Sequence, residues 1–178
     1  MVPPVKQQEI WLEYMQRKGD KSKKKAVYIH IPFCSQICLY CGFFQNYSNE
    51  ERETMYVDRL IKQLLMAKEY KYVQDSVINA VFFGGGTPST LSPYNADRLL
   101  KTMNEVLPLA NDCEITMEAR VHDLVDEKLQ VWFKHGVNRI SVGVQSLIRL
   151  SVKVWDAKMI KKLLLKILNE LQVIIKQY

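Results

Sequence analysis

The stretch "VINAVFFGGGTPSTLSPYNADRLL", Val77 to Leu100, contains one complete strand, turn and helix. Val77 to Phe83 is a continuous apolar run of strand length, and three glycines follow it directly. Ser92 and Pro93 are residue types preferred at the N-cap and at the first position of a helix. A buried strand that leads through a short turn into a helix is typical of a parallel sheet.

The same alternation extends along the chain on both sides of this unit. A short lead-in helix is predicted at Gln7–Arg17, a long helix begins after Ser48 or Asn49, and another spans Asp126–His135 and ends at Gly136. The predicted strands are Ala26–Pro32, Val77–Phe83, Glu114–Glu118 and Asn138–Val144. The pattern therefore predicts an α/β fold with about four parallel βα units, in a barrel or an open doubly wound sheet.

Length, composition and charge limit the functional classes. The chain has 178 residues, of which 48% are apolar, enough for one domain or for part of a larger one. No apolar run reaches membrane-spanning length, and the N-terminus lacks the pattern of a secretory signal, so we expect a cytoplasmic protein. The net charge of +6 is concentrated from Arg149 onward, where seven Lys or Arg, Arg149 included, accompany two Asp or Glu. A solvated basic tail is favoured over a nucleic-acid surface.

Polar and sulfur-containing residues follow all four predicted strands. Because the carboxyl ends of parallel strands meet at one edge of a sheet or barrel, we expect these residues to form one site. In chain order they are Cys34, Cys38 and Cys41, then Gly84 to Thr87, then Glu118, then Gln145.

The three close cysteines, "CSQICLYC", have three interpretations. An iron–sulfur cluster is favoured, because thiolates at such spacings hold clusters and three of them leave one iron of a four-iron cube open. Zinc is an alternative, although neither His30 nor Cys113 stands at the usual spacing for a fourth ligand. The third interpretation is that the three cysteines are buried thiols with no shared function. Cys113 itself is interpreted as a packing residue.

The glycine run after the second strand is a weak signal by itself. It lacks the lysine of a P-loop and the spacing of a dinucleotide fingerprint, so a tight turn is an equal alternative. Glycines also allow positive φ and close approach of the backbone to a ligand. Beside an open cluster iron, the run becomes a candidate cradle for that iron's ligand.

At these positions the sequence resembles the radical S-adenosylmethionine (SAM) enzymes, whose signature is CxxxCxxC with an aromatic residue before the last cysteine. "YIHIPFC", "FFGGGTPSTL" and "RISVGVQS" together resemble the oxygen-independent coproporphyrinogen III oxidases and their relatives, over about Val27 to Ser146. "CGFFQN" and "LPLANDCEITMEARV" are most similar to the branch of anaerobic haem-degrading methyltransferases. This resemblance implies a partial parallel (β/α) barrel of the radical SAM type.

The resemblance also implies cofactors and roles. Cys34, Cys38 and Cys41 would ligate a [4Fe–4S] cluster whose open iron binds SAM, and electron transfer would cleave SAM to methionine and a 5′-deoxyadenosyl radical. The implied cofactor contacts are Tyr28 near the cluster, Tyr40 at the adenine, Gly86 and Thr87 at the methionine end, and Glu118 and Gln145 at strand ends. Polar strand ends remain the alternative for the last two, and His30 is interpreted as a packed histidine.

The implied function is anaerobic haem degradation by methylation and ring opening, with haem or another tetrapyrrole as substrate and a flavodoxin- or ferredoxin-like electron donor. Three alternatives remain: an oxygen-independent coproporphyrinogen III oxidase, a haem chaperone without turnover, and an inactive gene fragment. No nucleic-acid partner and no membrane span are expected.

The sequence departs from the family pattern after "SVGVQS". We divide the chain into a lead-in helix and basic linker (1–25), the N-terminal part of a radical SAM core (26–146) and an atypical Lys/Leu-rich tail (147–178). The apolar spacing in the tail predicts a helix. Codons for Trp155–Lys162 can be written so that another reading frame encodes a Gly-Arg-containing segment like that of the family. A frameshift near Leu147 and a truncated product are therefore expected.

Overall fold

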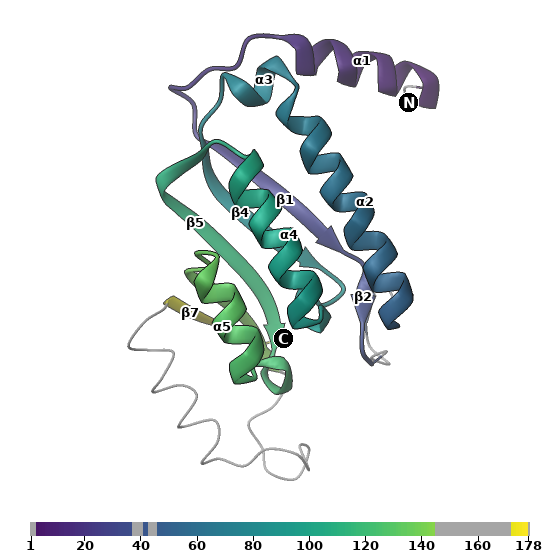
Figure 1. Cartoon of the computed structure of the whole chain (residues 1–178), viewed down its shortest axis with the longest axis vertical. Helices are drawn as coiled ribbons and strands as arrows, with labels where there is room; N and C mark the ends of the chain where they lie inside the picture. The colour runs from purple at the N-terminus through teal and green to yellow at the C-terminus, as the bar shows by residue number, and fades with distance from the viewer. Residues whose placement is uncertain (1–2, 37–40, 43–45, 145–171, 178) are drawn as a thin grey trace.

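The computed structural model describes residues 3–36, 41–42, 46–144 and 172–177. The α-helices are α1 (Pro4–Gln16), α2 (Glu50–Lys68), α3 (Lys71–Gln74), α4 (Pro93–Val106) and α5 (Asp126–Lys134), and two 3-10 turns are η1 (Pro88–Thr90) and η2 (Val121–Asp123). The strands are β1 (Lys25–Ile31), β2 (Phe33–Cys34), β3 (Asn46–Tyr47), β4 (Ile78–Gly85), β5 (Leu109–Arg120), β6 (Arg139–Val144) and β7 (Gln172–Gln177). Figure 1 shows their arrangement.

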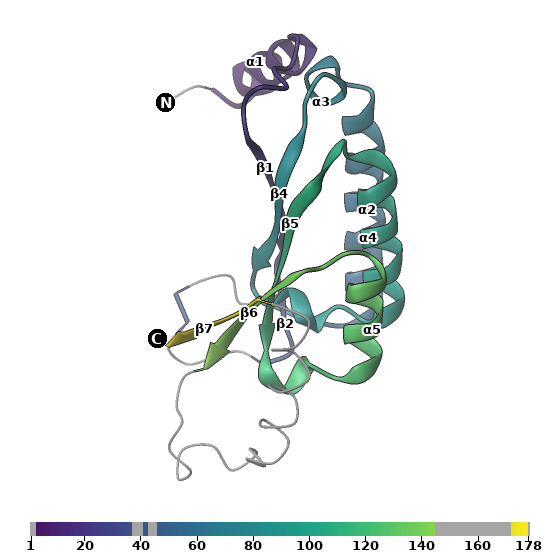
Figure 2. The ribbon, with the colours of Figure 1, turned by 90° about the vertical axis from the view of Figure 1, so that its left-hand side faces the viewer.

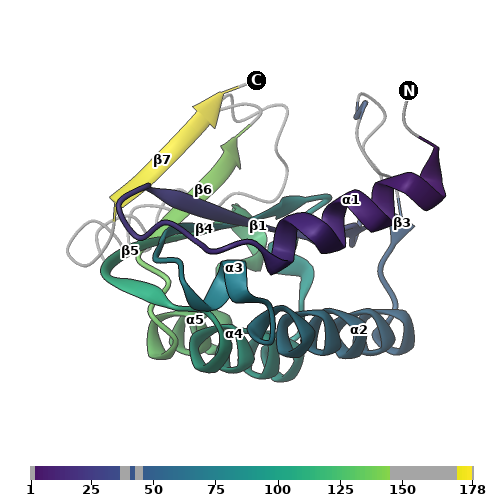
Figure 3. The same cartoon turned by 90° about the horizontal axis from the view of Figure 1, so that it is seen from above.

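The main sheet has five parallel strands in the order β1-β4-β5-β6-β7, and β2 and β3 form a small parallel pair. Helices α2, α4 and α5 lie on one face of this sheet (Figures 2 and 3). The α/β fold with parallel βα units is therefore confirmed, and the strands that the sequence predicts are β1, β4, β5 and β6. The largest difference between a predicted and an observed strand boundary is at β5, which begins five residues before the predicted start at Glu114.

The two faces of the sheet differ in character. Side chains that alternate toward the helices are almost fully buried, among them Ile31, Phe83 and Ile140, each 0% exposed. We call the opposite face, which carries none of these three helices, the inner face. Tyr28 on this face is 58% exposed, while Phe82, its neighbour on β4, is half-buried. Apolar burial therefore holds the sheet on the helices and leaves the inner face for other contacts.

A buried carboxylate links α2 to the start of α4. Ser92 caps α4, as predicted, and its side chain accepts a hydrogen bond from the Asn95 amide. Glu53 of α2 is only 4% exposed and accepts hydrogen bonds from the Ser92 amide, the Ser92 hydroxyl and the Asn95 side chain, each at 2.8 Å. The contacts satisfy the buried charge and fix the helix end above the turn that follows β4.

The C-terminal tail differs from its predicted structure. Gln172–Gln177 form β7, which pairs with β6 along its whole length, whereas the spacing of apolar residues predicted a helix there. Val173, Ile174 and Ile175 are β-branched, and β6 offers an unpaired edge, so sheet pairing outweighs helical periodicity. The sheet thus has a fifth parallel strand, whereas the sequence pattern predicted four. Residues 147–171 of the predicted tail helix lie outside the described residues.

Helix α1 lies at the end of the sheet opposite β2 (Figures 1 and 2). It packs on the α3 region through Trp11 against Tyr70, with ring centroids 5.1 Å apart, and Tyr14 against Tyr72, at 5.0 Å. Among the described helices, none combines the length and apolar character that crossing a membrane requires. The lead-in helix is therefore a structural addition at the amino ends of the strands, away from the cysteines.

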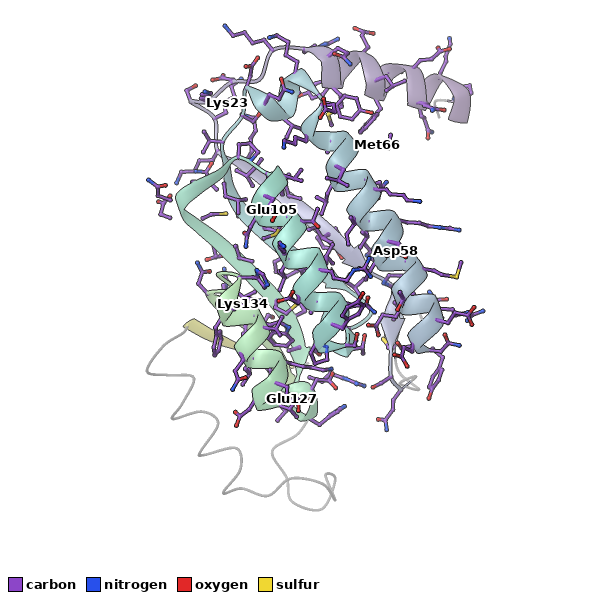
Figure 4. The ribbon with its side chains drawn as sticks, in the orientation of Figure 1. Lys23, Asp58, Met66, Glu105, Glu127 and Lys134 are labelled. Atoms are coloured by element: carbon purple, nitrogen blue, oxygen red, sulfur yellow. The ribbon has the colours of Figure 1, made fainter. Side chains whose placement is uncertain are left out.

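An ion-pair cluster joins α4 to the end of α5 and gives stability a pH dependence. The Asp97 carboxylate lies 2.8 Å from both Lys134 Nζ and His135 Nε2 (Lys134 is labelled in Figure 4). Hydrogen bonds from Lys134, and then from His135, lower the pKa of Asp97 below its ordinary value of 3.8. The stabilisation from this carboxylate is therefore present above pH 3.8 and is lost as the pH falls through the lowered pKa.

Replacing Asp97 with asparagine is expected to reduce the free energy of unfolding at neutral pH by up to about 1 kcal/mol, the range of partly exposed ion pairs. The difference from wild type should shrink as the pH falls below 3.8. Urea titrations at several pH values measure it. Glu105→Gln, which breaks an exposed pair with Lys101 at 3.9 Å, is the control and should change little. An Asp97→Asn difference that persists undiminished to the lowest pH would contradict the assignment.

Candidate functional site

The first cysteine and the glycine turn meet at the carboxyl ends of β1 and β4. The Gly86 amide donates to the Ile31 carbonyl at 2.9 Å, and the Thr87 amide donates to the Phe33 carbonyl at 2.8 Å. These bonds extend the β1–β4 pairing into the turn. They bring Cys34 Sγ within 3.4 Å of Thr87 Oγ1. Of the predicted convergence, the structure shows the meeting of the first cysteine, Cys34, with the glycine turn.

Two of the glycines are required by this close approach. Gly85 has φ of +123°, and a Cβ there would lie 2.7 Å from the Ile31 carbonyl oxygen and 2.8 Å from the His30 ring. A Cβ on Gly86 would lie 2.7 Å from the Phe33 oxygen and 3.0 Å from Cys34 Sγ. The sulfur of Cys34 therefore faces bare backbone. A thiolate ligand beside a backbone cradle fits a cluster with a small molecule bound to it.

Tyr28 lies on the inner face, in a group of rings below the glycine turn. Its ring stacks on Phe82 with centroids 6.1 Å apart and 13° between planes, and its hydroxyl lies 3.2 Å from His30 Nδ1. Although the residue as a whole is 58% exposed, desolvation within the ring group, and secondarily the charge of Glu118, raises the pKa of Tyr28. Tyr56 of α2 donates to the His30 carbonyl at 2.8 Å, which fixes the end of β1. His30 packs in this ring group, as the interpretation of a packed histidine expects.

Glu118 lies near the end of β5 and is half-buried. It pairs in register with Ser141 of β6, and its charge acts on Tyr28 across the inner face. Tyr28 and Glu118 thus lie on the inner face of the main sheet, and the Cys34–Thr87 contact lies beyond the carboxyl ends of β1 and β4. An aromatic ring and a carboxylate on this face, next to a thiol, suit a cationic organic ligand held beside a metal cluster.

The remaining predicted site residues have different outcomes. Cys38, Tyr40 and Gln145 lie outside the described residues, and Cys41 is half-buried at the end of that gap. Cys113 is 7% exposed within the hydrophobic core, so its predicted packing role is confirmed, and burial raises the pKa of its thiol. Within the described ranges, no three His, Cys, Asp or Glu side chains converge as metal ligands.

Sequence reasoning missed a polar network beside the cysteine segment. Ser89 of η1 is 0% exposed and donates to the Asp123 carboxylate at 2.7 Å. Arg120 donates to the same carboxylate at 3.1 Å, and the Lys128 ammonium donates to the Ser89 carbonyl at 2.6 Å. Burial lowers the pKa of Lys128. The only signal in the sequence was a cluster of polar residues after the third strand and the glycine turn, which no spacing rule connects.

Comparisons with known proteins agree with this geometry. The chain is 42% identical to anaerobilin synthase of Escherichia coli O157:H7 over 147 residues, which cover 82% of this chain and 33% of that protein. It is 41% identical to the heme chaperone HemW of Escherichia coli K12 over 122 residues, covering 68% and 32%. The chain thus spans about a third of the length of the curated relatives it matches.

A solved structure of coproporphyrinogen III oxidase (HemN) from Escherichia coli superposes with a TM-score of 0.79. The match covers 95% of this chain and 40% of that one at 23% sequence identity, and it confirms the fold as part of a radical SAM barrel. The model of the Radical SAM superfamily matches residues 28–166, from the ring group of β1 through all four predicted strands. The chain therefore belongs to the radical SAM superfamily, whose cofactors are a [4Fe–4S] cluster and S-adenosylmethionine.

Proposed function

We propose that this chain contains the cluster- and cofactor-binding part of a radical SAM enzyme that degrades haem anaerobically by methylation and ring opening. The observation that carries the proposal is the 42% identity to anaerobilin synthase across the site-bearing segment. The contact of Cys34 Sγ with the Thr87 hydroxyl supports it, as does the space at Gly86 that a Cβ would take from this sulfur, because both join the cysteine motif to the glycine turn.

In this proposal the cysteines bind the cluster, and side chains at the strand ends bind SAM. The bound cluster would supply the electron for reductive cleavage of SAM. The proposed ligands are Cys34, Cys38 and Cys41, and the proposed SAM contacts are Tyr28, Tyr40, Gly86, Thr87, Glu118 and Gln145.

The hydrogen bonds of the glycine turn determine how it can hold the methionine end of SAM. The amides of Gly86 and Thr87 already donate to the carbonyls of Ile31 and Phe33. The Thr87 carbonyl already accepts hydrogen bonds from the Thr90 amide and hydroxyl. An ammonium group would therefore be accepted by the carbonyl oxygens of the glycines in this turn. We infer that this turn binds the amino group of methionine and that the carboxylate is bound elsewhere in the site.

Glu118 and Tyr28 would face the rest of the cofactor from the inner face. A carboxylate near an aromatic ring attracts a positively charged group such as a sulfonium. The neighbouring Phe82 ring keeps Tyr28 in one orientation by stacking. These residues bind and orient the ligand, and their aromatic surfaces exclude water from it.

A second candidate function is haem binding without turnover. It is favoured by the 41% identity to the heme chaperone HemW, a relative that covers 68% of this chain. Coproporphyrinogen oxidation has weaker support, because the HemN structure shares the fold at only 23% identity. A flavodoxin- or ferredoxin-like electron donor is proposed for either of the two enzymatic activities.

Anaerobic reconstitution of the chain with iron and sulfide tests the proposal. We expect the visible absorbance of an iron–sulfur cluster, release of 5′-deoxyadenosine from SAM under a strong chemical reductant, and consumption of haem in the same reaction. Cluster and haem binding without deoxyadenosine would favour the chaperone alternative. In a parallel reaction that contains coproporphyrinogen III, loss of this substrate, with haem left intact in the first reaction, would favour the oxidase. Uptake of zinc but no iron would contradict all three.

A further inference from the structure

Arg120 connects the cysteine segment to the end of β5. Its guanidinium donates through Nη2 to the hydroxyl of Ser35, the residue after the first cysteine, and through Nε to the Asp123 carboxylate at 3.1 Å. Its backbone amide donates to Ser89 Oγ at 3.2 Å. One residue at a strand end thus contacts the cysteine segment, η1 and η2 together.

The anchor of this arginine is well buried. The side chains of Arg120 and Asp123 are 18% and 11% exposed, which makes this the most buried Arg–carboxylate pair among the described residues. Asp123 also accepts from Ser89, which is fully buried. A guanidinium held on one side by a buried carboxylate has a fixed orientation, and its remaining donors point in a defined direction.

The alternation of side chains along β5 relates Arg120 to Glu118, the carboxylate that we propose contacts the cofactor. Glu118 and Arg120 are two residues apart on β5, so their side chains leave the same face of the strand. Ser35 follows Cys34, whose sulfur already contacts Thr87. Cys34 also pairs with Tyr47 of β3, and its carbonyl accepts a hydrogen bond from the Ser48 amide. The contact of Arg120 with Ser35 is a further attachment of the cysteine segment, and it starts from the strand that carries Glu118.

We propose that Arg120 is a positioning residue that holds the cysteine segment, through Ser35, at a fixed place relative to Glu118. This inference rests on the proposed function in so far as Cys34 binds the cluster and Glu118 binds SAM. Arg120 itself touches neither. Its guanidinium, fixed by Asp123, holds the segment of Cys34 at a set distance from β5. SAM could then contact the cluster at Cys34 and the Glu118 carboxylate without rearrangement of either.

The test uses Arg120→Gln and Ser35→Ala, with Arg98→Gln as the matched control. Arg98 also pairs with a carboxylate, that of Asp58, which is labelled on α2 in Figure 4, but this pair lies on the helix side of the sheet. In the chain without metal, Arg120→Gln and Ser35→Ala should raise hydrogen exchange of the peptide that contains Ser35, and the control should not. Unchanged exchange in both variants would overturn the proposal.

With the cluster assembled, the two variants should bind SAM about tenfold more weakly, because binding must then also order the cysteine segment that the Arg120–Ser35 hydrogen bond holds in wild type. When SAM is added, the electron paramagnetic resonance spectrum of the cluster should show broader lines in these variants than in wild type. The effects of Ser35→Ala and Arg120→Gln should not add in the double variant, because both remove the same contact. Normal SAM affinity despite raised exchange would overturn the positioning role.

Arg120→Lys separates positioning from charge. Lysine keeps the positive charge but has no planar fork that reaches Asp123 and Ser35 together. We expect it to resemble Arg120→Gln in exchange and in SAM affinity, whereas recovery of both would show that charge alone matters and would overturn the proposal. If wild type assembles no cluster, the proposed function fails, and hydrogen exchange alone decides whether Arg120 holds the segment.

Discussion

Replacing Cys34 with serine is expected to abolish deoxyadenosine formation and to lower the iron retained after desalting by about tenfold, the effect of losing a thiolate ligand. A serine hydroxyl stays protonated at neutral pH and is a weak iron ligand, whereas a thiol loses its proton readily on metal binding. Cys34 is half-buried, and serine has nearly the same size, so the fold should persist. Iron and sulfide analysis after anaerobic reconstitution measures the effect.

Cys113→Ala is the control for this change. It also removes a sulfur, but from the hydrophobic core, where Cys113 is 7% exposed. It should retain the wild-type iron content while losing about 1 kcal/mol of stability to the small cavity. Retention of the cluster in Cys34→Ser, or equal loss of iron in both variants, would show that the first cysteine is not a ligand.

The parts of this molecule that depend on local pattern could be predicted from sequence. The strand before the glycines, the Ser92 cap and the Gly136 helix end all follow from the chemistry of adjacent residues, and each is present. The meeting of Cys34 with Thr87 also followed, because parallel strands necessarily bring their carboxyl ends to one edge.

Other parts depend on which strands become neighbours and could not be predicted. Ser35 and Arg120 are separated by 85 positions, and only the order β1-β4-β5 brings them together. The predicted helix in the tail was wrong for a different reason. The apolar residues there recur at a helical spacing, but Gln172–Gln177 pair as a strand with the open edge of β6. Tertiary pairing overrode local propensity there.

Gly85→Ala is expected to destabilise the chain by about 3 kcal/mol, which combines the cost of a strained φ with that of overpacking. The native φ of +123° disfavours any side chain, and the new Cβ would lie 2.7 Å from the Ile31 carbonyl oxygen. Since Gly85 pairs with Ile31 at the end of the β1–β4 ladder, relief would require the two strands to separate there. Thermal unfolding should show a midpoint lower by about 10 °C for a chain of this size.

Gly42→Ala is the control for Gly85→Ala, because a Cβ at Gly42 would meet no atom of the described residues within 4 Å, and its midpoint should match wild type within about 1 °C. Gly86→Ala separates stability from metal binding. Gly86 has no positive φ, but its Cβ would lie 3.0 Å from Cys34 Sγ and 2.7 Å from the Phe33 oxygen. It should lose less stability than Gly85→Ala yet retain less iron than Gly42→Ala, because the sulfur is displaced. Equal iron in Gly86→Ala and Gly42→Ala would mean that the cradle does not position the first ligand, and the link between the glycine turn and the cluster would have to be abandoned.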